Sequence, residues 1–182
     1  MNKDTNIFIQ QFKKGDKKAF DSIVLSHKDV VIGMIYKMVL NRQDAEDISQ
    51  DVFVSVYFAL DKFKGGSSFK TWLYRIIINK VNEHYRKLKL RSIFSFNISD
   101  IDDVNVSYAD DDKAFSQYDK KLLFKAIVSL TGKQRSVVLL RIYQGHSFKD
   151  ISKYLEISIN NAKVMFHQAK MSLIKKLKKY AE

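Results

Sequence analysis

Side chains that can pair with nucleic-acid bases and phosphates gather near the end of the chain, between residues 160 and 170. Asn and Gln amides can bond bidentately to adenine, a Lys ammonium can reach guanine, and a Val side chain can contact the methyl group of thymine. The basic run at residues 175–179 is suited to phosphates, or simply to solvation of a helix end. The candidate contacts to DNA are Asn160, Asn161, Lys163, Val164, His167, Gln168 and Lys170.

Two short helical patterns, separated by a three-residue break, would position these side chains. Ser147 and Asp150 have capping-box spacing, with Asp in the place of the usual Glu, and Ser158 can cap the second helix. This arrangement predicts a helix-turn-helix motif, whose second helix lies in the major groove of duplex DNA. The apolar positions expected to face inward are Phe148, Ile151, Leu155, Ala162, Met165, Phe166, Ala169, Leu173 and Leu177.

A second cluster of functional side chains is acidic and contains Asp44, Glu46, Asp47 and Asp51, with no Lys or Arg after it until Lys62. Asp44 can be explained by a favourable interaction with the start of a helix, but Asp51 is too far from that start. A negative patch in an otherwise basic segment predicts contact with a basic protein surface rather than with DNA. The apolar stripe of the same helix is expected at Ile48, Val52, Val56 and Ala59.

A third group combines cations with aromatic rings, behind a Gly-Gly-Ser-Ser loop at residues 65–68. The helical pattern over residues 69–91 carries seven Lys or Arg side chains. Aromatic rings beside cations can stack bases of single-stranded nucleic acid at about 1 to 3 kcal/mol each. The spacing favours a core position for Trp72, whereas it leaves Tyr74 and Tyr85 open between core and surface.

The composition limits what these groups can serve. The chain has 182 residues, no Cys, no Pro, 46% hydrophobic residues and a formal net charge of +12, which favours packed cores and anionic partners. No apolar run approaches the ~20 residues of a membrane span, and the first residues do not resemble a secretory signal. We therefore expect a cytoplasmic protein without membrane insertion.

His residues lack metal-ligand spacing and there is no Gly-rich phosphate loop, so we expect no metal, no cofactor and no enzyme activity.

Charge divides the chain into three parts. Residues 1–96 hold 17 Lys and Arg against 10 Asp and Glu, residues 97–119 hold 1 against 7, and residues 120–182 hold 14 against 3. The acidic middle part has no sustained apolar period and is rich in Asp, Ser and Asn. An acidic linker could shield basic surfaces, although ordinary solubility also explains it. The sequence predicts an all-α protein with two small helical domains, 1–96 and 120–182, joined by an acidic flexible linker, 97–119.

Two longer segments resemble the extracytoplasmic-function group of bacterial sigma-70 transcription initiation factors. The stretch "DAEDISQDVFVSVYFALDKFKGGSSFKTWLYRIIINK" is similar to region 2 of that family, and "LTGKQRSVVLLRIYQGHSFKDISKYLEISINNAKVMFHQAKMSLIKKL" is similar to its region 4. The resemblance implies a factor that binds core RNA polymerase, directs it to promoters by recognising −10 and −35 elements, and promotes strand opening. It also implies that domain 1–96 is region 2 and domain 120–182 is region 4.

The resemblance further implies partners and roles for individual residues. The acidic helix would dock on the clamp-helix coiled coil of the largest polymerase subunit, and the recognition helix at residues 160–170 would read the −35 element. The polymerase flap, promoter DNA and an anti-sigma factor are the other implied partners. The implied polymerase contacts are Asp44, Glu46, Asp47, Gln50, Asp51 and Phe53. The implied −10 contacts, with an extruded base held in a pocket near the loop, are Phe63, Lys64, Gly65, Ser67, Ser68, Phe69, Trp72, Tyr74, Arg75, Asn79 and Lys80.

The chain also departs from the family pattern at four places. A Pro is missing from "LTGKQR", and Glu156 stands where a Gly is usual, so a left-handed turn there would be strained. Asn161 replaces a common phosphate-binding Thr, and Met165 replaces a common Arg. The last two changes make the front of the recognition helix less basic and predict an unusual or weaker −35 contact.

A rival interpretation is a stand-alone helix-turn-helix regulator of transcription. It would explain the second domain and the net charge without RNA polymerase. It leaves the acidic stretch Asp44 to Asp51 and the sequence "TWLYR" unexplained.

Overall fold

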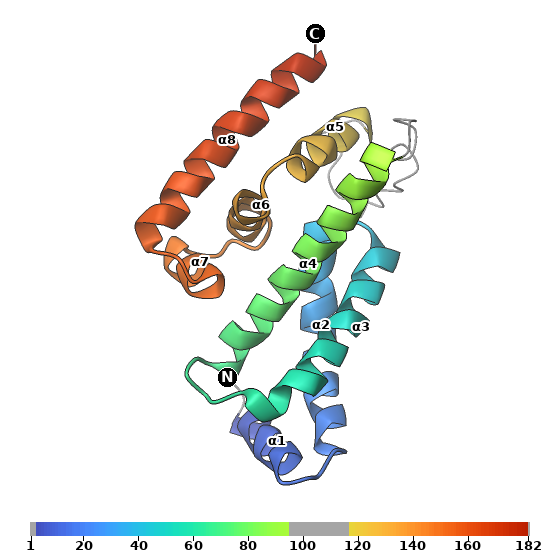
Figure 1. The fold of residues 1–182 in the computed structure, drawn as a ribbon, viewed down its shortest axis with the longest axis vertical. Helices are drawn as coiled ribbons and strands as arrows, with labels where there is room; N and C mark the ends of the chain where they lie inside the picture. Colours follow the sequence, from blue (N-terminus) through green and yellow to red (C-terminus); the bar gives the residue numbers. More distant parts are fainter. Residues whose placement is uncertain (1–2, 95–116, 182) are drawn as a thin grey trace. The chain divides into compact units, whose positions relative to one another are not determined.

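The computed structural model describes residues 3–94 and 117–181, and this part of the chain is all-α, as the sequence predicted (Figure 1). It divides into two compact units, Met1–Val81 and Asn82–Glu182. Most of the predicted linker lies outside the described residues. Its last three residues belong to a helix that begins at Gln117. Within the described residues, no helix is both long and apolar enough to cross a membrane.

The first unit consists of α1 (Lys3–Lys13), α2 (Ala19–Val39), α3 (Arg42–Ala59), a 3₁₀ turn (Leu60–Lys62) and the first part of α4 (Phe69–Phe94) (Figure 1). Periodic apolar residues let these helices bury one face each against the others. The largest fully buried side chains of this core are Phe12, Ile23, Val31, Ile35, Met38, Leu60, Phe69 and Ile77.

A side-chain cap defines the start of α3. The Asn41 side chain accepts a hydrogen bond from the Asp44 backbone N–H at 3.0 Å, which caps the helix. Asp44 is therefore in the first turn but is not the cap. The buried positions on α3 are Ala45, Ile48, Ser49, Val52 and Val56, while the predicted Ala59 is only half-buried.

The second unit contains α5 (Gln117–Val128), α6 (Gly132–Val138), a π-helical turn (Leu139–Tyr143), α7 (Phe148–Leu155) and α8 (Ile159–Ala181). A capping box of Thr131 and Gln134 starts α6. Leu130, Val138 and Ala169 form a buried cluster, and Phe166 and Leu173 pack against it.

A buried arginine closes the end of α5. Arg135 is 4% exposed, and its guanidinium donates to the carbonyl oxygens of Ile127, Val128 and Leu130 at 3.2, 2.9 and 2.7 Å. Ile127 and Val128 are the last residues of α5 and Leu130 follows it, where no further helical turn supplies donors to the carbonyl groups. The Ile127 carbonyl also accepts from the Leu130 backbone N–H at 3.1 Å. Burial lowers the pKa of Arg135, and the nearby Tyr85 opposes this effect. The side chain thus joins α6 to the end of α5.

Candidate functional site

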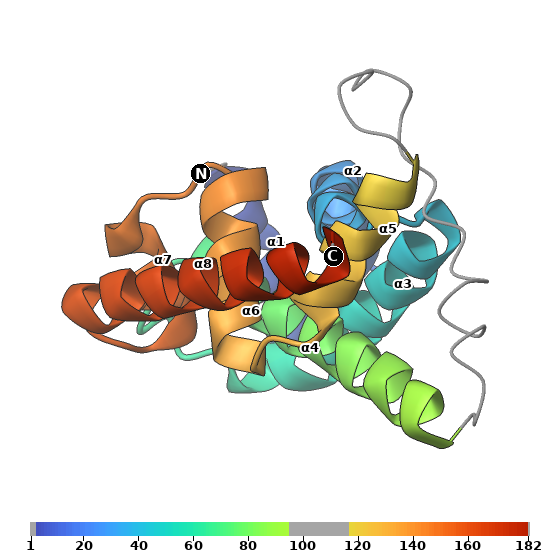
Figure 2. The ribbon, with the colours of Figure 1, turned by 90° about the horizontal axis from the view of Figure 1, so that it is seen from above.

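Helices α7 and α8 form the predicted helix-turn-helix. Figures 1 and 2 show the short α7 leading directly into the long α8. Ser147 accepts from the backbone N–H of Asp150 at 3.1 Å, and Ser158 accepts from the backbone N–H of Asn161 at 3.1 Å. Both predicted caps are therefore present, and they fix where each helix begins.

The turn between the two helices passes through a left-handed residue. Glu156 has φ 53° and ψ 47°, and its backbone N–H donates to the carbonyl of Ser152. A left-handed conformation at this position is usually filled by Gly because a Cβ atom is unfavourable there. This observation confirms the predicted conformation of the turn.

Helix α8 is buried on one face and exposed on the other. Ala162 and Ala169 are fully buried, and Phe166 is half-buried against the core of the unit. In α7, Ile151 and Tyr154 are buried, whereas the predicted Leu155 is half-buried. The exposed residues of α8 include every candidate DNA contact: Asn160, Asn161, Lys163, Val164, His167, Gln168 and Lys170.

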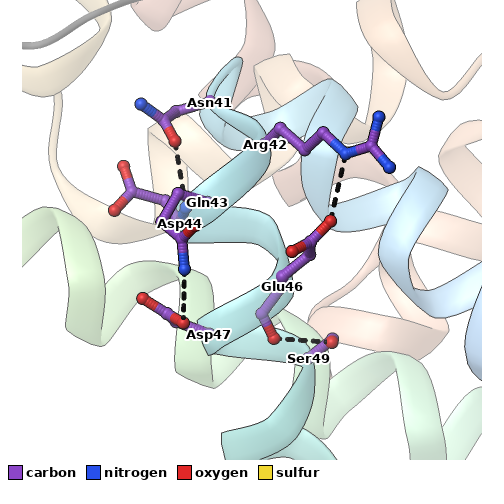
Figure 3. A network of polar contacts seen from close by, with 7 residues as sticks. All are labelled: Asn41, Arg42, Gln43, Asp44, Glu46, Asp47 and Ser49. Carbon is purple, nitrogen blue, oxygen red and sulfur yellow. Dashed lines mark hydrogen bonds and ion pairs between the residues drawn. The ribbon is translucent and has the colours of Figure 1, made fainter.

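The acidic side chains lie at the start of α3 and differ in their partners (Figure 3). Glu46 pairs with Arg42 at 3.0 Å, so part of its charge is compensated. Asp47 accepts from the amide of Gln43 at 3.2 Å, a neutral partner that does not compensate a negative charge. Asp47, Gln50 and Asp51 are exposed, while the other predicted members of the site, Asp44, Glu46 and Phe53, are half-buried.

Asp47 and Asp51 carry the negative charge of this face. Residues three, four and seven positions apart share one side of a helix, so Asp44, Asp47 and Asp51 lie along one line of α3. Arg42 is the only basic residue of the helix. Such a face is electrostatically suited to a basic partner surface.

The aromatic side chains after α3 pack as one cluster within the first unit. The Phe63 ring lies 5.1 Å from the Trp72 ring and 5.9 Å from the Phe69 ring, and Trp72 lies 5.7 Å from Phe69, measured between centroids. Phe69 is 2% exposed, which makes it a core residue, whereas Phe63 and Trp72 are half-buried. Only the last two retain accessible surface for a base.

The loop that follows Phe63 is held at both ends. Lys13 donates to the Phe63 carbonyl oxygen, and the Ser68 hydroxyl accepts from the backbone N–H of Thr71 at 3.2 Å, which caps α4. Gly65 has φ 75°, a left-handed conformation that favours glycine. Between these anchors Lys64, Gly65 and Ser68 are exposed, and Ser67 is half-buried.

The remaining −10 candidates lie along α4. Asn79 is exposed, and Arg75 and Lys80 are half-buried. Tyr74, which the sequence left open, is 8% exposed and lines a pocket of about 320 Å³. Tyr85, also left open, is 1% exposed, so its ring is not available for stacking.

This pocket lies among α1, α2 and α4 of the first unit, and sequence reasoning named only Phe69 and Tyr74 of its lining as site residues. His27 has its ring 5.3 Å from that of Phe69, and its Nδ1 lies 2.9 Å from the carbonyl oxygen of Ile23. Thr5 and Ser26 add hydroxyl groups to the lining, and Lys70 adds a cation. No local motif joins these positions, because they converge only through the packing of three helices.

The comparisons with known proteins agree with both halves of this description. The family models Sigma-70 region 2 and Sigma-70 region 4 match residues 23–91 and 120–173. The ECF RNA polymerase sigma factor SigW of Bacillus subtilis is 29% identical over 177 residues, which cover 93% of this chain and 95% of that protein.

Two solved structures share the fold. CnrH, in complex with the cytosolic domain of CnrY, has a TM-score of 0.59 and 22% identity, covering 96% of this chain and 97% of its own. The sigma factor RpoE of Bartonella quintana, in complex with the anti-sigma factor NepR, has a TM-score of 0.52 and 24% identity, covering 88% and 98%.

The two family models match in the order that the sequence predicted. The region 2 match also contains the acidic helix α3, which a stand-alone regulator leaves unexplained. The stand-alone regulator is therefore not favoured. The chain belongs to the extracytoplasmic-function group of sigma-70 family RNA polymerase sigma factors, and it acts in promoter-specific initiation of transcription.

Proposed function

We propose that α3 docks on the clamp-helix coiled coil of the largest subunit of core RNA polymerase. The observation that carries this proposal is the exposure of Asp47, Gln50 and Asp51 on one side of a helix, in a chain whose net charge is +12. Acidic side chains on that surface favour a basic partner and repel nucleic acid. Asp44, Glu46 and Phe53 complete the contact at its edge.

The first unit then captures the −10 element. The exposed loop residues Lys64, Gly65 and Ser68, together with Ser67, would follow the strand, while Phe63 and Trp72 offer rings to an unstacked base. Phe69 acts by supporting these rings, since it is buried beneath them. Arg75, Asn79 and Lys80 continue along α4 as contacts to the strand, and Tyr74 is reached through the pocket that it lines.

The exposed face of α8 reads the −35 element in the major groove. Asn161, Lys163 and Gln168 offer donors to base edges and phosphates, and Val164 offers an apolar contact to a thymine methyl group. Asn160, His167 and Lys170 extend the same exposed surface. The absence of an arginine at Met165 makes this contact less basic at its front.

The domain boundaries and the remaining partners follow from this scheme. Region 2 occupies residues 1–96, the linker occupies residues 97–119, and region 4 occupies residues 120–182. Region 4 also contacts the polymerase flap. The protein catalyses no reaction and needs no metal or cofactor, because the polymerase performs the chemistry in the cytoplasm. An anti-sigma factor holds the chain inactive, as the complex of RpoE with NepR suggests by analogy.

A charge-reversal experiment tests the docking surface. Asp47→Lys combined with Asp51→Lys should abolish association with core polymerase while the helical content measured by circular dichroism stays unchanged. The matched control is Asp29→Lys, which reverses an exposed acid on α2. Wild-type affinity in the double variant would remove α3 as the docking surface.

A further inference from the structure

The exposed face of α3 continues beyond its acidic residues. Residues 7 and 11 positions apart share a helix face, so Val54 and Phe58 lie in line with Asp47. Val54 is 55% exposed and Phe58 is 75% exposed. Among the described residues, no other large hydrophobic side chain has a greater exposed fraction than Phe58. The stripe therefore has an acidic end and an apolar end on one helix.

The exposed phenylalanine has a rigid support. The Phe58 ring lies 5.5 Å from the Tyr57 ring at an interplanar angle of 89°, and the Tyr57 ring contacts those of Phe12 and Phe20 at 5.3 and 5.1 Å. Phe12 is fully buried and Tyr57 is half-buried, so the ring that Phe58 contacts packs against the core. An anchor that is already held on one side loses little conformational freedom on binding.

We infer that the polymerase-docking face of α3 includes Val54 and Phe58, and that its partner presents basic side chains opposite Asp47 and Asp51 and an apolar pocket opposite Phe58. This inference rests on the proposed docking of α3. The inference is based on two observations. The acidic and apolar residues form one continuous stripe on α3, and the acidic residues require basic side chains on the partner. The acidic end steers the encounter, and the apolar end slows dissociation.

A second copy of the chain fits this face less well. Two-fold pairing through α3 would set Asp47 and Asp51 of each copy against the same acids of the other copy if the helices were parallel, and against its apolar end if they were antiparallel. Like charges oppose the parallel contact, and the antiparallel contact leaves both carboxylates on apolar surface without a cation. A polymerase helix with a basic end has no such penalty.

The experiment measures the dissociation constant and dissociation rate of full-length protein from core polymerase for wild type, Phe58→Ala and Leu25→Ala. Leu25 is the matched control because it is a 65% exposed apolar residue on α2. Phe58→Ala should weaken binding about tenfold, as truncation of an interface anchor does, mainly by faster dissociation. Leu25→Ala should bind as wild type. Circular dichroism of each variant checks that the fold is kept.

The outcomes distinguish the apolar extension at Val54 and Phe58 from the docking of α3 on which it rests. Wild-type affinity for Phe58→Ala, with binding lost in the Asp47→Lys and Asp51→Lys double variant, overturns the apolar extension and leaves the docking of α3 intact. Wild-type affinity for both overturns the docking proposal as well. If Phe58→Ala instead abolishes self-association of the free protein in sedimentation, with polymerase affinity unchanged, the apolar end is a contact between copies and the inference is wrong.

Discussion

Glu156 shows at the residue scale how the turn of the helix-turn-helix differs from the usual one. Its φ of 53° is a conformation in which a Cβ atom costs about 1 kcal/mol, and glycine avoids this cost. Glu156→Gly should raise the free energy of unfolding in urea by about 1 kcal/mol. Glu156→Ala is the control, because it removes the charge but keeps the Cβ atom. Equal gains from both variants would mean that charge, not backbone conformation, is the cause.

The cap of α7 makes a pH-dependent contribution to the free energy of unfolding. The Ser147 hydroxyl donates to the Asp150 carboxylate at 2.6 Å, and this hydrogen bond lowers the pKa of Asp150 below its ordinary value. Because the folded pKa is the lower one, the contribution is fully present above the unfolded pKa and is lost as the pH falls through the folded pKa. Ser147→Ala should move the pKa of Asp150 up toward its ordinary value in an NMR titration of the carboxyl group. An unchanged pKa would show that the hydroxyl is not the cause.

Single residues were predictable from sequence where a local rule decided them. Ser147 and Ser158 are caps because short polar side chains precede apolar periods, and both caps are present. The burial of Tyr85 depends on neighbours that no local rule singles out. The pairing of Glu46 with Arg42, in contrast, has the i, i+4 spacing of helix ion pairs and was predictable from it. Phe58 lies outside the apolar stripe predicted for α3, and the structure leaves it 75% exposed.

At the scale of elements, Arg135 connects α6 to the end of α5. Removing its guanidinium leaves the carbonyl groups of Val128 and Leu130 without this donor, at about 1 to 3 kcal/mol for an unsatisfied group, whereas the Ile127 carbonyl still accepts from the Leu130 backbone N–H. Arg135→Met should therefore lower the free energy of unfolding by roughly 3 kcal/mol in urea. Arg135→Lys should cost less, since an ammonium can still donate to one or two of these oxygens. Equal loss in both would indicate that packing, not hydrogen bonding, is responsible.

Helix α8 makes a separate prediction about DNA. Lys163→Ala combined with His167→Ala should weaken the dependence of transcription on the −35 sequence. Removal of Lys163 should also reduce the slope of log affinity against log salt concentration by about 1 if it neutralises one phosphate. Both residues are exposed, so helical content should not change. If transcription from every −35 variant equals that of wild type, the face assigned to α8 is wrong.

The elements that were predicted well are those with a strong period and a clear start. Helices α3, α4, α7 and α8 form where helices were predicted because apolar spacing is regular there, and predicted caps start α7 and α8. Helix α1 was not predicted, although Ile9 and Phe12 on it are buried, because a short helix near a terminus has few apolar positions. The pocket lined by His27 and Tyr74 depends on three helices and has no signal in any of them alone.

At the scale of the whole molecule, surfaces of opposite charge lie on different helices of one chain. The uneven charge indicated this division, since the basic helices and the acidic start of α3 cannot serve the same partner. How promoter elements are read depends on contacts with DNA and polymerase, which the sequence of one chain does not encode. The family matches at both ends of the chain agree with this division of tasks.

Reconstituted transcription tests the central claim most directly. Core RNA polymerase is mixed with the purified protein and an AT-rich genomic library, and transcript start sites are mapped for wild type and for the Asp47→Lys and Asp51→Lys double variant. The account predicts defined start sites that share −10 and −35 motifs with wild-type protein and none with the variant. Tight binding of duplex DNA by the protein alone, without any start site that depends on it, would contradict the account.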